Sequence, residues 1–331
     1  MAHTEDRTRR LIVGTATGVC QVMSTADGQA EIIDHVTPLP HAVARLAVCQ
    51  TQPHIVYLAA YEGGMWRSDD GGGTWRQLRA YPVEQAHSVV VDPHNPAIVY
   101  VGSEPAAIFH SRDGGETWRE CEGFRAVPES TGWHFFAPRQ AHVRDLTMAA
   151  DDPQRLYAGL EVGGVVRSTD GGATWQQLHG PYADVHSLSV TPAQASTLYA
   201  ATARQPWRSD DGGDTWTAIG RGLPHRYIVP IAAAPDTPDL VLVSCSTSFQ
   251  RQTGHLARST DGGHSWQQTA WPGPHNDMVI AIAWDPTAPR TVFAGTDSGK
   301  LYRSADHGAS WQALPVELDS VAVGGLQVMP G

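Results

Sequence analysis

The sequence lacks several features that would assign it to common classes of protein. No stretch approaches the roughly 18 consecutive apolar residues of a membrane-spanning helix. The first ten residues are polar, so the apolar segment of a secretory signal is missing there. Basic residues are outnumbered, with 23 Lys and Arg against 34 Asp and Glu, and the formal net charge of −11 would repel nucleic-acid phosphates. We therefore expect neither a membrane nor a nucleic acid as partner.

Cysteine is also scarce. The four residues Cys20, Cys49, Cys121 and Cys245 show none of the paired spacings that hold a metal ion. Thiols stay reduced in the cytoplasm, and an unpaired cysteine behaves as a small apolar residue. We predict buried free thiols in a cytoplasmic protein.

Charged residues make up only 17% of the 331 residues, whereas glycine (33) and proline (23) are plentiful. This composition favours many short strands and turns over long helices. The length would suit two average domains, but repeat folds routinely exceed that average in one piece.

One pattern, Ser-x-Asp-x-Gly-x-Thr/Ser-Trp, occurs six times. The copies begin at Ser68, Ser111, Ser168, Ser209, Ser259 and Ser304, and end at Trp75, Trp118, Trp175, Trp216, Trp266 and Trp311. Successive tryptophans are 41 to 57 residues apart. A period of about 40–50 residues with about four strands is typical of one blade of a β-propeller.

These six copies resemble the Asp-box, or BNR, repeat, which is found in sialidases, xyloglucanases, sortilin-type receptors and photosystem II assembly factors. The resemblance covers nearly the whole chain and implies that each box is the turn between the third and fourth strands of a blade. Aspartate accepts hydrogen bonds from turn amides, and glycine adopts backbone conformations closed to other residues. Tryptophan would pack between blades. We therefore interpret the boxes as structural and not catalytic.

The two ends of the chain complete the ring. Residues 11–34 read as strands two to four of a blade with a degraded box near Ser24–Gly28, and residues 320–328 read as a first strand with no blade after it. Pairing the two removes open sheet edges. We predict a polar tail over residues 1–10 and, over 11–331, a single all-β, seven-bladed propeller with four-stranded blades, closed by the C-terminal strand.

Departures from the repeat mark the places where function was added. The connection between Trp118 and His142 is longer than its counterparts and contains the aromatic run Trp133-His134-Phe135-Phe136. The connection over 244–255 is also long. Both are predicted to open on the face opposite the boxes, where long loops usually serve binding.

Polar residues occupy the starts of the first strands on this same face. Two positions, two residues apart, hold Gln85/His87, His142/Arg144 and Asp184/His186 in three consecutive blades, where other blades are mostly apolar. We expect a cluster near the channel mouth that contains His87, His142, His186, Glu104, Glu161, Asp184, Arg144, Arg226 and Tyr227.

Three interpretations of this cluster remain open, the simplest being polar side chains that line a wet channel. The second is a pocket for a small polar or anionic molecule, or for a protein segment. Arginine suits such ligands because its donors form a planar fork. The predicted contacts are Arg144, Arg226, Tyr227, Trp133, His134 and His225.

The third interpretation is an enzyme of hydrolase or oxidase type with a divalent transition metal. Imidazole and carboxylate ligands suit Zn, Fe, Mn or Cu, and an open coordination position activates water or oxygen. The candidate ligands are His87, His142, His186, Glu104 and Glu161.

Glycoside hydrolysis is a further alternative that the repeat alone does not justify. Candidate catalytic residues are Glu161, Asp184 and Tyr227. Sialidases, however, carry an Arg-Ile-Pro-type motif before the repeats, and this chain lacks it. We take ligand binding as the main prediction, with the metal enzyme and the glycoside hydrolase as alternatives.

Overall fold

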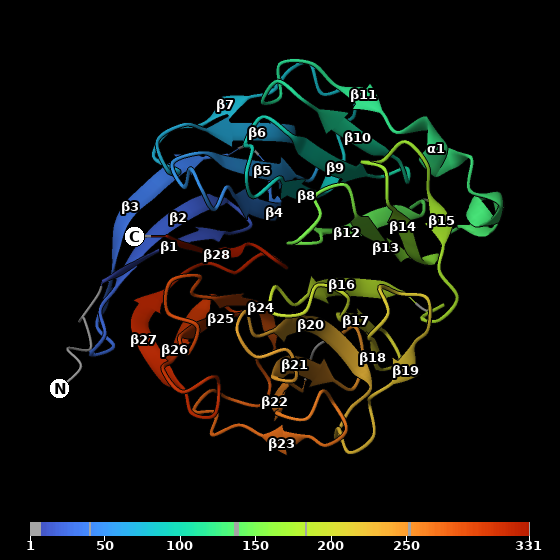
Figure 1. The fold of residues 1–331 in the computed structure, drawn as a ribbon. Helices are drawn as coiled ribbons and strands as arrows, with labels where there is room; N and C mark the ends of the chain where they lie inside the picture. The colour runs from blue at the N-terminus through green and yellow to red at the C-terminus, as the bar shows by residue number, and fades with distance from the viewer. Residues whose placement is uncertain (1–7, 40, 136–138, 183, 251–252, 331) are drawn as a thin grey trace.

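A computed structural model describes residues 8–39, 41–135, 139–182, 184–250 and 253–330. Within them the strands form seven four-stranded sheets arranged around a centre (Figure 1). The innermost strands are β4, β8, β12, β16, β20, β24 and β28. The predicted all-β, seven-bladed propeller is confirmed.

Blade 1 combines both ends of the chain, in the order β28 (Leu326–Met329), β1 (Arg9–Gly14), β2 (Gly18–Ser24) and β3 (Ala30–Pro38). Blade 2 consists of β4 (Val43–Val48), β5 (Val56–Ala60), β6 (Gly64–Ser68) and β7 (Arg76–Gln77). Blade 3 consists of β8 (Ala86–Val91), β9 (Val99–Ser103), β10 (Ile108–Ser111) and β11 (Arg119–Glu120). Blade 4 consists of β12 (His142–Met148), β13 (Leu156–Glu161), β14 (Gly164–Ser168) and β15 (Gln176–Gln177).

Blade 5 consists of β16 (Val185–Val190), β17 (Leu198–Thr202), β18 (Pro206–Ser209) and β19 (Thr217–Ala218). Blade 6 consists of β20 (Tyr227–Ala233), β21 (Val241–Ser246), β22 (His255–Ser259) and β23 (Gln267–Gln268). Blade 7 consists of β24 (Val279–Trp284), β25 (Val292–Thr296), β26 (Lys300–Ser304) and β27 (Gln312–Glu317). The long connection between blades 3 and 4 carries the helix α1 (Glu122–Arg125) and a 3-10 turn (Pro128–Gly132).

The ring closes where β28 pairs antiparallel with β1, from Arg10 opposite Met329 to Val13 opposite Leu326. Strand β1 begins at Arg9, so it includes the last two residues of the predicted polar tail, residues 9 and 10. Only the last part of the predicted 320–328 strand is extended. Just before β28 the chain forms a turn, and the Gly325 carbonyl in it accepts a hydrogen bond from the Gly14 N–H (2.6 Å).

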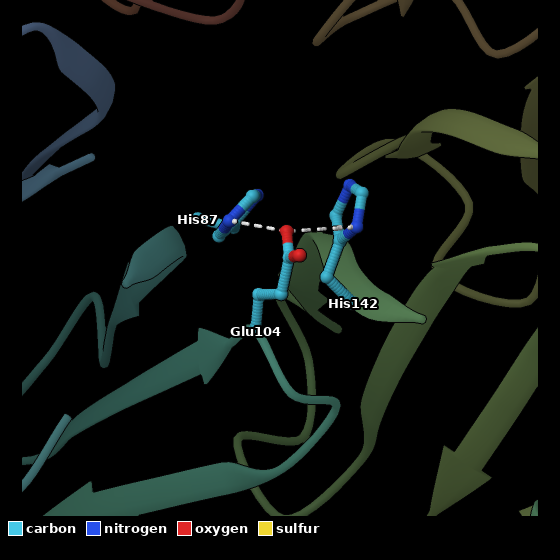
Figure 2. Close-up of side chains that lie close together, drawn as sticks. All are labelled: His87, Glu104 and His142. Atoms are coloured by element: carbon cyan, nitrogen blue, oxygen red, sulfur yellow. Dashed lines mark ion pairs between the residues drawn. The ribbon is translucent and has the colours of Figure 1, made fainter. Parts of the chain in front are cut away.

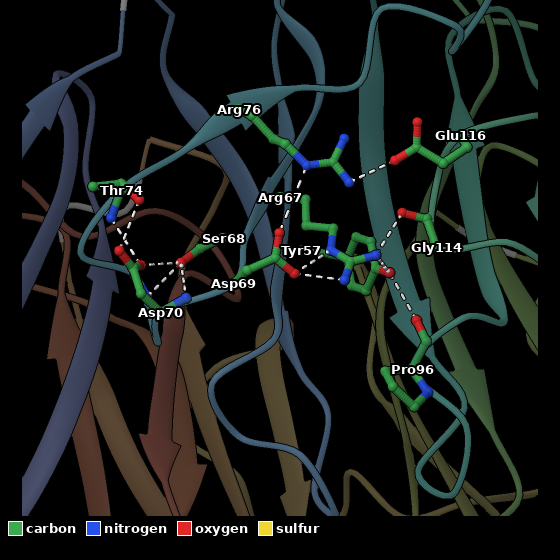
Figure 3. Close-up of polar contacts among 11 residues, drawn as sticks. Tyr57, Arg67, Ser68, Asp69, Asp70, Thr74, Arg76, Pro96, Gly114 and Glu116 are labelled. Atoms are coloured by element: carbon green, nitrogen blue, oxygen red, sulfur yellow. Dashed lines mark hydrogen bonds and ion pairs between the residues drawn. The ribbon is translucent and has the colours of Figure 1, made fainter.

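The Asp-box turn is held by one serine and one aspartate, as Figure 3 shows for blade 2. The Gly72 N–H donates to Ser68 Oγ (2.7 Å), and the Thr74 N–H and hydroxyl donate to the Asp70 carboxylate (2.8 and 2.7 Å). Gly72 has a φ of +95°, which a side chain would strain. Burial raises the pKa of Asp70, but these hydrogen bonds outweigh it and hold the pKa at about 2.

Each box also braces the neighbouring blade. Arg67 from β6 donates to the Gly114 carbonyl in the box of blade 3 (2.9 Å), and Tyr57 donates to the Pro96 carbonyl of that blade (2.7 Å; Figure 3). The same kind of contact recurs between blades 4 and 5, where Arg167 and Tyr157 both donate to the Gly212 carbonyl. At the closure, Arg303 of blade 7 donates to the Ala26 carbonyl in the degraded box of blade 1 (3.0 Å).

The apolar core is divided into clusters that lie between neighbouring blades. Between blades 2 and 3, Trp118 packs edge-on against Tyr81. Between blades 3 and 4, Trp175 packs against Phe124 of α1, with ring centroids 5.6 Å apart. Tryptophan and its neighbours bury large apolar areas, so the prediction that the box tryptophans join the blades is confirmed.

The cysteines agree with the expectation from their spacing. Cys49, Cys121 and Cys245 are buried free thiols, and Cys20 is half-buried. Burial raises the pKa of the Cys121 thiol to about 12, which keeps it protonated and unreactive. In the part of the chain that the structure describes, no helix has the length and apolarity needed to cross a membrane.

Replacing Ser68 by alanine should lower the free energy of unfolding by about 1–3 kcal/mol, because the buried Gly72 N–H loses its acceptor. The measurement is thermal or urea unfolding of purified protein. Ser248→Ala, in a surface loop, is the matched control and should change stability by less than about 0.5 kcal/mol. Equal effects of the two substitutions would contradict the structural role assigned to the box.

Candidate functional site at the channel mouth

The first strands of blades 2 to 7 share an irregularity near their start. In each of them the pairing with the second strand shifts register, as between Ala86 and Ser88 in blade 3. The extra residue is His87, Arg144 or His186 in blades 3 to 5, but Ala44 and Ile280 in blades 2 and 7. A bulge changes the direction of a side chain, so the simple alternation assumed in the sequence analysis does not describe these positions.

Two of the predicted histidines meet one of the predicted glutamates. Figure 2 shows one Glu104 carboxylate oxygen between the imidazoles of His87 and His142. Glu104 Oε2 lies 3.3 Å from His87 Nε2 and 3.5 Å from His142 Nδ1. The two rings are 4.3 Å apart at their centroids. Blades 3 and 4 thus contribute to a single group.

Both imidazoles are buried, and this sets their charge. The side chains of His87 and His142 are only 4% and 2% exposed. Burial, reinforced by nearby positive charges, lowers the pKa of His87 to about 2 and that of His142 to about 4. Both are therefore neutral near pH 7, the form in which histidine binds metal ions.

Glu161 connects this group to the next one. Its carboxylate accepts a hydrogen bond from the Arg144 guanidinium and lies 3.9 Å from His142 Nε2. Burial would lower the pKa of Arg144, but the charge of Glu161 outweighs it and raises that pKa. Arg144 and Glu161 therefore form an ion pair beside the channel, with side chains 18% and 10% exposed.

A second polar group lies on blades 4 and 5. Glu161, Asp184 and His186 offer ligand atoms that all lie within 4.8 Å of one another. Burial and the neighbouring Glu161 carboxylate raise the pKa of Asp184. His186 Nδ1 lies 2.6 Å from the Ile228 carbonyl, which orients the ring, and the Tyr227 ring lies 4.7 Å away, between centroids.

Beside Glu104 the long connection between blades 3 and 4 forms a cavity of about 390 Å³, which we call the aromatic pocket. It is lined by Pro105, Ala106, Arg125, Ser130, Trp133, His134, Phe135, Arg139, Gln140 and Ala141. The Gln140 N–H donates to Glu104 Oε1 (2.9 Å), and Arg139 lies 3.8 Å from Glu104 Oε2. This pocket and the His87–Glu104–His142 group therefore adjoin. The predicted Phe136 lies outside the described residues.

The structure places the remaining ligand candidates elsewhere. Arg226 and His225 line a separate pocket of about 300 Å³ together with Gln205, Pro206 and Arg221. His225 also faces His255, whose ring stacks on His275 at 5.1 Å between centroids. The predicted contacts thus fall into three places: the channel mouth, the aromatic pocket and this blade 5–6 pocket.

Some residues at the mouth were missed in the sequence analysis. Tyr61 packs edge-on against His87, with ring centroids 4.9 Å apart. It follows the second strand of blade 2, as Glu104 follows that of blade 3, and Glu161 at the end of β13 occupies the same position in blade 4. The alignment of second strands therefore carries the signal for Tyr61. Arg45, from the first strand of blade 2, pairs with Asp145 of blade 4 (2.9 Å) inside the channel. No local pattern links residues that distant in sequence.

The sequence profile of the BNR/Asp-box repeat matches residues 109–120, the box of blade 3. Xyloglucanase Xgh74A of Acetivibrio thermocellus is 22% identical over 297 residues, which is 83% of this chain and 30% of that protein. This chain therefore spans less than a third of that relative.

Two solved structures share the fold. A GH74 enzyme from Niastella koreensis superposes with a TM-score of 0.58 at 16% identity, covering 94% of this chain and 66% of the other. YCF48 bound to a D1 peptide gives 0.60 at 17% identity, covering 84% and 82%. This protein is a seven-bladed propeller built from Asp-box repeats, similar in sequence to part of a xyloglucanase and similar in fold to GH74 enzymes and to YCF48.

Replacing Glu161 by glutamine should lower the free energy of unfolding by about 2–4 kcal/mol, because the largely buried Arg144 loses its counter-charge. The double variant Arg144→Met/Glu161→Leu should recover much of this loss. Denaturant unfolding measures both, with the exposed Glu129→Gln as control. Unchanged stability of the Glu161→Gln variant would contradict this role and show that water solvates the Arg144 charge well enough without Glu161.

Proposed function

We propose that this propeller is a binding module that holds a protein segment across the channel mouth. The segment places an apolar side chain in the aromatic pocket and a carboxylate beside Arg139. The observation that carries the proposal is the continuity between that pocket and the polar group of Glu104, made by Arg139 and Gln140. An apolar hollow with a few convergent polar groups is the usual form of a ligand site.

The chemistry of the pocket favours an anionic ligand. Arg125, Arg139 and His134 line it, on a chain whose formal net charge is −11; Arg125 pairs with Glu120 outside the lining, and Arg139 lies 3.8 Å from Glu104 Oε2. Arg139 is 53% exposed and stands over the Phe135 ring at 5.3 Å, so its guanidinium can face a ligand carboxylate while its stem covers the ring. A basic, aromatic hollow on an acidic protein selects acidic segments and disfavours basic ones.

One protein of the same fold supports a segment rather than a free metabolite. YCF48, which has this fold, is solved with a D1 peptide. An extended peptide also suits the geometry, because the aromatic pocket and the channel mouth lie side by side and a small molecule would occupy only one of them. A small polar or anionic molecule that fills the mouth alone remains the simpler version of the same proposal.

The binding proposal is tested with the acetylated octapeptide Gly-Ser-Gly-Phe-Asp-Gly-Ser-Gly, labelled for fluorescence anisotropy. Phe135→Ala and Arg139→Glu should each weaken binding at least about tenfold, since each removes an anchor of the ligand. Exchanging Asp for Lys in the peptide should have a similar effect. Arg221→Glu, in the blade 5–6 pocket, is the matched control and should leave affinity unchanged. Equal binding by all variants, or none by the native protein, would refute the proposal.

A specific observation favours glycoside hydrolysis as a second candidate. The relatives include xyloglucanases, and one carboxylate oxygen of Glu161 lies within 4.8 Å of one of Asp184. That spacing is nearer to the about 5–5.5 Å of retaining enzymes than to the about 6.5–9.5 Å of inverting ones. Asp184, with its raised pKa, would be the acid, and Glu161, paired with Arg144, would be the nucleophile.

Xyloglucan oligosaccharides separate the two candidates. For a binding module we expect no release of reducing ends by the native protein above a heat-inactivated control. Release that falls at least about 100-fold in Asp184→Asn would replace the binding assignment by hydrolysis. Arg221→Glu, in the separate blade 5–6 pocket, serves as the control and should leave any such activity intact.

A further inference from the structure

We propose that His87, Glu104 and His142 form a binding site for a divalent first-row transition metal, with zinc as the reference ion. Two residues come from blade 3 and one from blade 4, so the site bridges the two blades at the floor of the mouth (Figure 2). Glu104 adjoins both this site and the aromatic pocket, but metal binding needs only the three ligands and does not require the peptide proposal to hold.

The spacing of the three side chains fits a metal ion. Zinc binds imidazole nitrogen and carboxylate oxygen at about 2.0–2.2 Å, so two ligands of a tetrahedral ion lie roughly 3.3–3.5 Å apart. Glu104 Oε2 lies 3.3 Å from His87 Nε2 and 3.5 Å from His142 Nδ1. All three ligand atoms lie within 4.8 Å of one another, so small side-chain rotations complete the site.

A buried nitrogen at this place has no hydrogen-bond partner. His87 Nε2 is enclosed, and it directs its polar atom at the Glu104 oxygen over 3.3 Å without making a hydrogen bond among the described residues. An unsatisfied buried polar atom costs about 1–3 kcal/mol. A metal ion between nitrogen and carboxylate would satisfy both groups.

The surroundings hold the ligands in place. The Gln140 N–H donates to the other oxygen of Glu104, which fixes the carboxylate plane. On the other side of the ring, His142 Nε2 faces Glu161 at 3.9 Å. A metal would replace the proton that His142 Nδ1 can donate to the Gln140 carbonyl at 3.2 Å, and the Nε2–H would then face Glu161, where a shift of a few tenths of an ångström would form the carboxylate–histidine–metal arrangement common in metal sites.

The ligand types select the metal. Two imidazoles and one carboxylate suit zinc and the divalent transition metals, whereas calcium and magnesium prefer oxygen ligands. Three protein ligands also leave a coordination position open, as catalytic zinc sites do. The neighbouring group of Glu161, Asp184 and His186 is less suitable, because the Arg144 guanidinium already neutralises Glu161.

The test uses purified protein dialysed against chelator and titrated with zinc by calorimetry, and with cobalt by visible absorption. One equivalent of zinc should bind, with cobalt bands typical of nitrogen and oxygen ligands. His87→Ala, His142→Ala and the near-isosteric Glu104→Gln should each weaken zinc binding at least about 100-fold, because losing a ligand costs more than losing a group that only hydrogen-bonds to a ligand. His255→Ala is the matched control, since it belongs to the separate group of His225 and His275.

Each outcome decides the proposal. Binding that is lost in Glu104→Gln but kept in His255→Ala supports the site. The opposite pattern assigns the metal to the other histidines and overturns the proposal, as does native protein that binds no zinc or cobalt. The peptide assay is run in chelator, so a failure of the metal site leaves the binding function untouched.

Discussion

The pairing of β28 with β1 is the constraint on which the rest of the structure depends. Six blades are formed by consecutive segments, and each needs a neighbour on both sides to cover its apolar faces. Only when the last strand completes the first blade does every blade gain that neighbour. The channel mouth exists because the innermost strands are then held side by side, so the position of His87 against His142 follows indirectly from contacts made on blade 1.

The boxes and the site divide the molecule into two faces with different chemistry. On one face, repeated hydrogen bonds of serine, aspartate and arginine side chains hold each turn and connect it to the neighbouring blade. The serine, aspartate and arginine groups that make these bonds are thus already paired within the protein. On the other face the repeat is broken by an aromatic connection and by polar residues at bulges. The rigid turns on one face fix the blades relative to one another. Side chains from separate blades can therefore be held close enough to share a ligand on the opposite face, although they lie on strands and not on a dedicated loop.

The fold could be predicted from the sequence because its signal is repeated. Six boxes fix the period, and the strand-like ends account for the seventh blade. The site was predicted only in part. Aligned first and second strands selected His87, His142, Glu104 and Glu161, since equivalent positions in a repeat lie at equivalent heights.

The alignment could not predict which of these side chains contact one another. Arg226 and His225 precede their strand and lie in another pocket. Bulges shift the side chains of His87, Arg144 and His186, and the sequence carries no local signal for a bulge. The Arg45–Asp145 contact joins blades that are not neighbours, which no repeat pattern encodes.

That contact has a mechanical meaning. By linking blade 2 directly to blade 4, it forms a strut that bypasses blade 3, and Arg45 also reaches the Arg144 carbonyl at 3.5 Å. Blade 3, which carries His87 and Glu104, therefore lies between two blades that are also joined to each other. Local opening of a sheet requires its neighbours to yield, so this ion pair opposes loosening of the sector that holds the paired imidazoles.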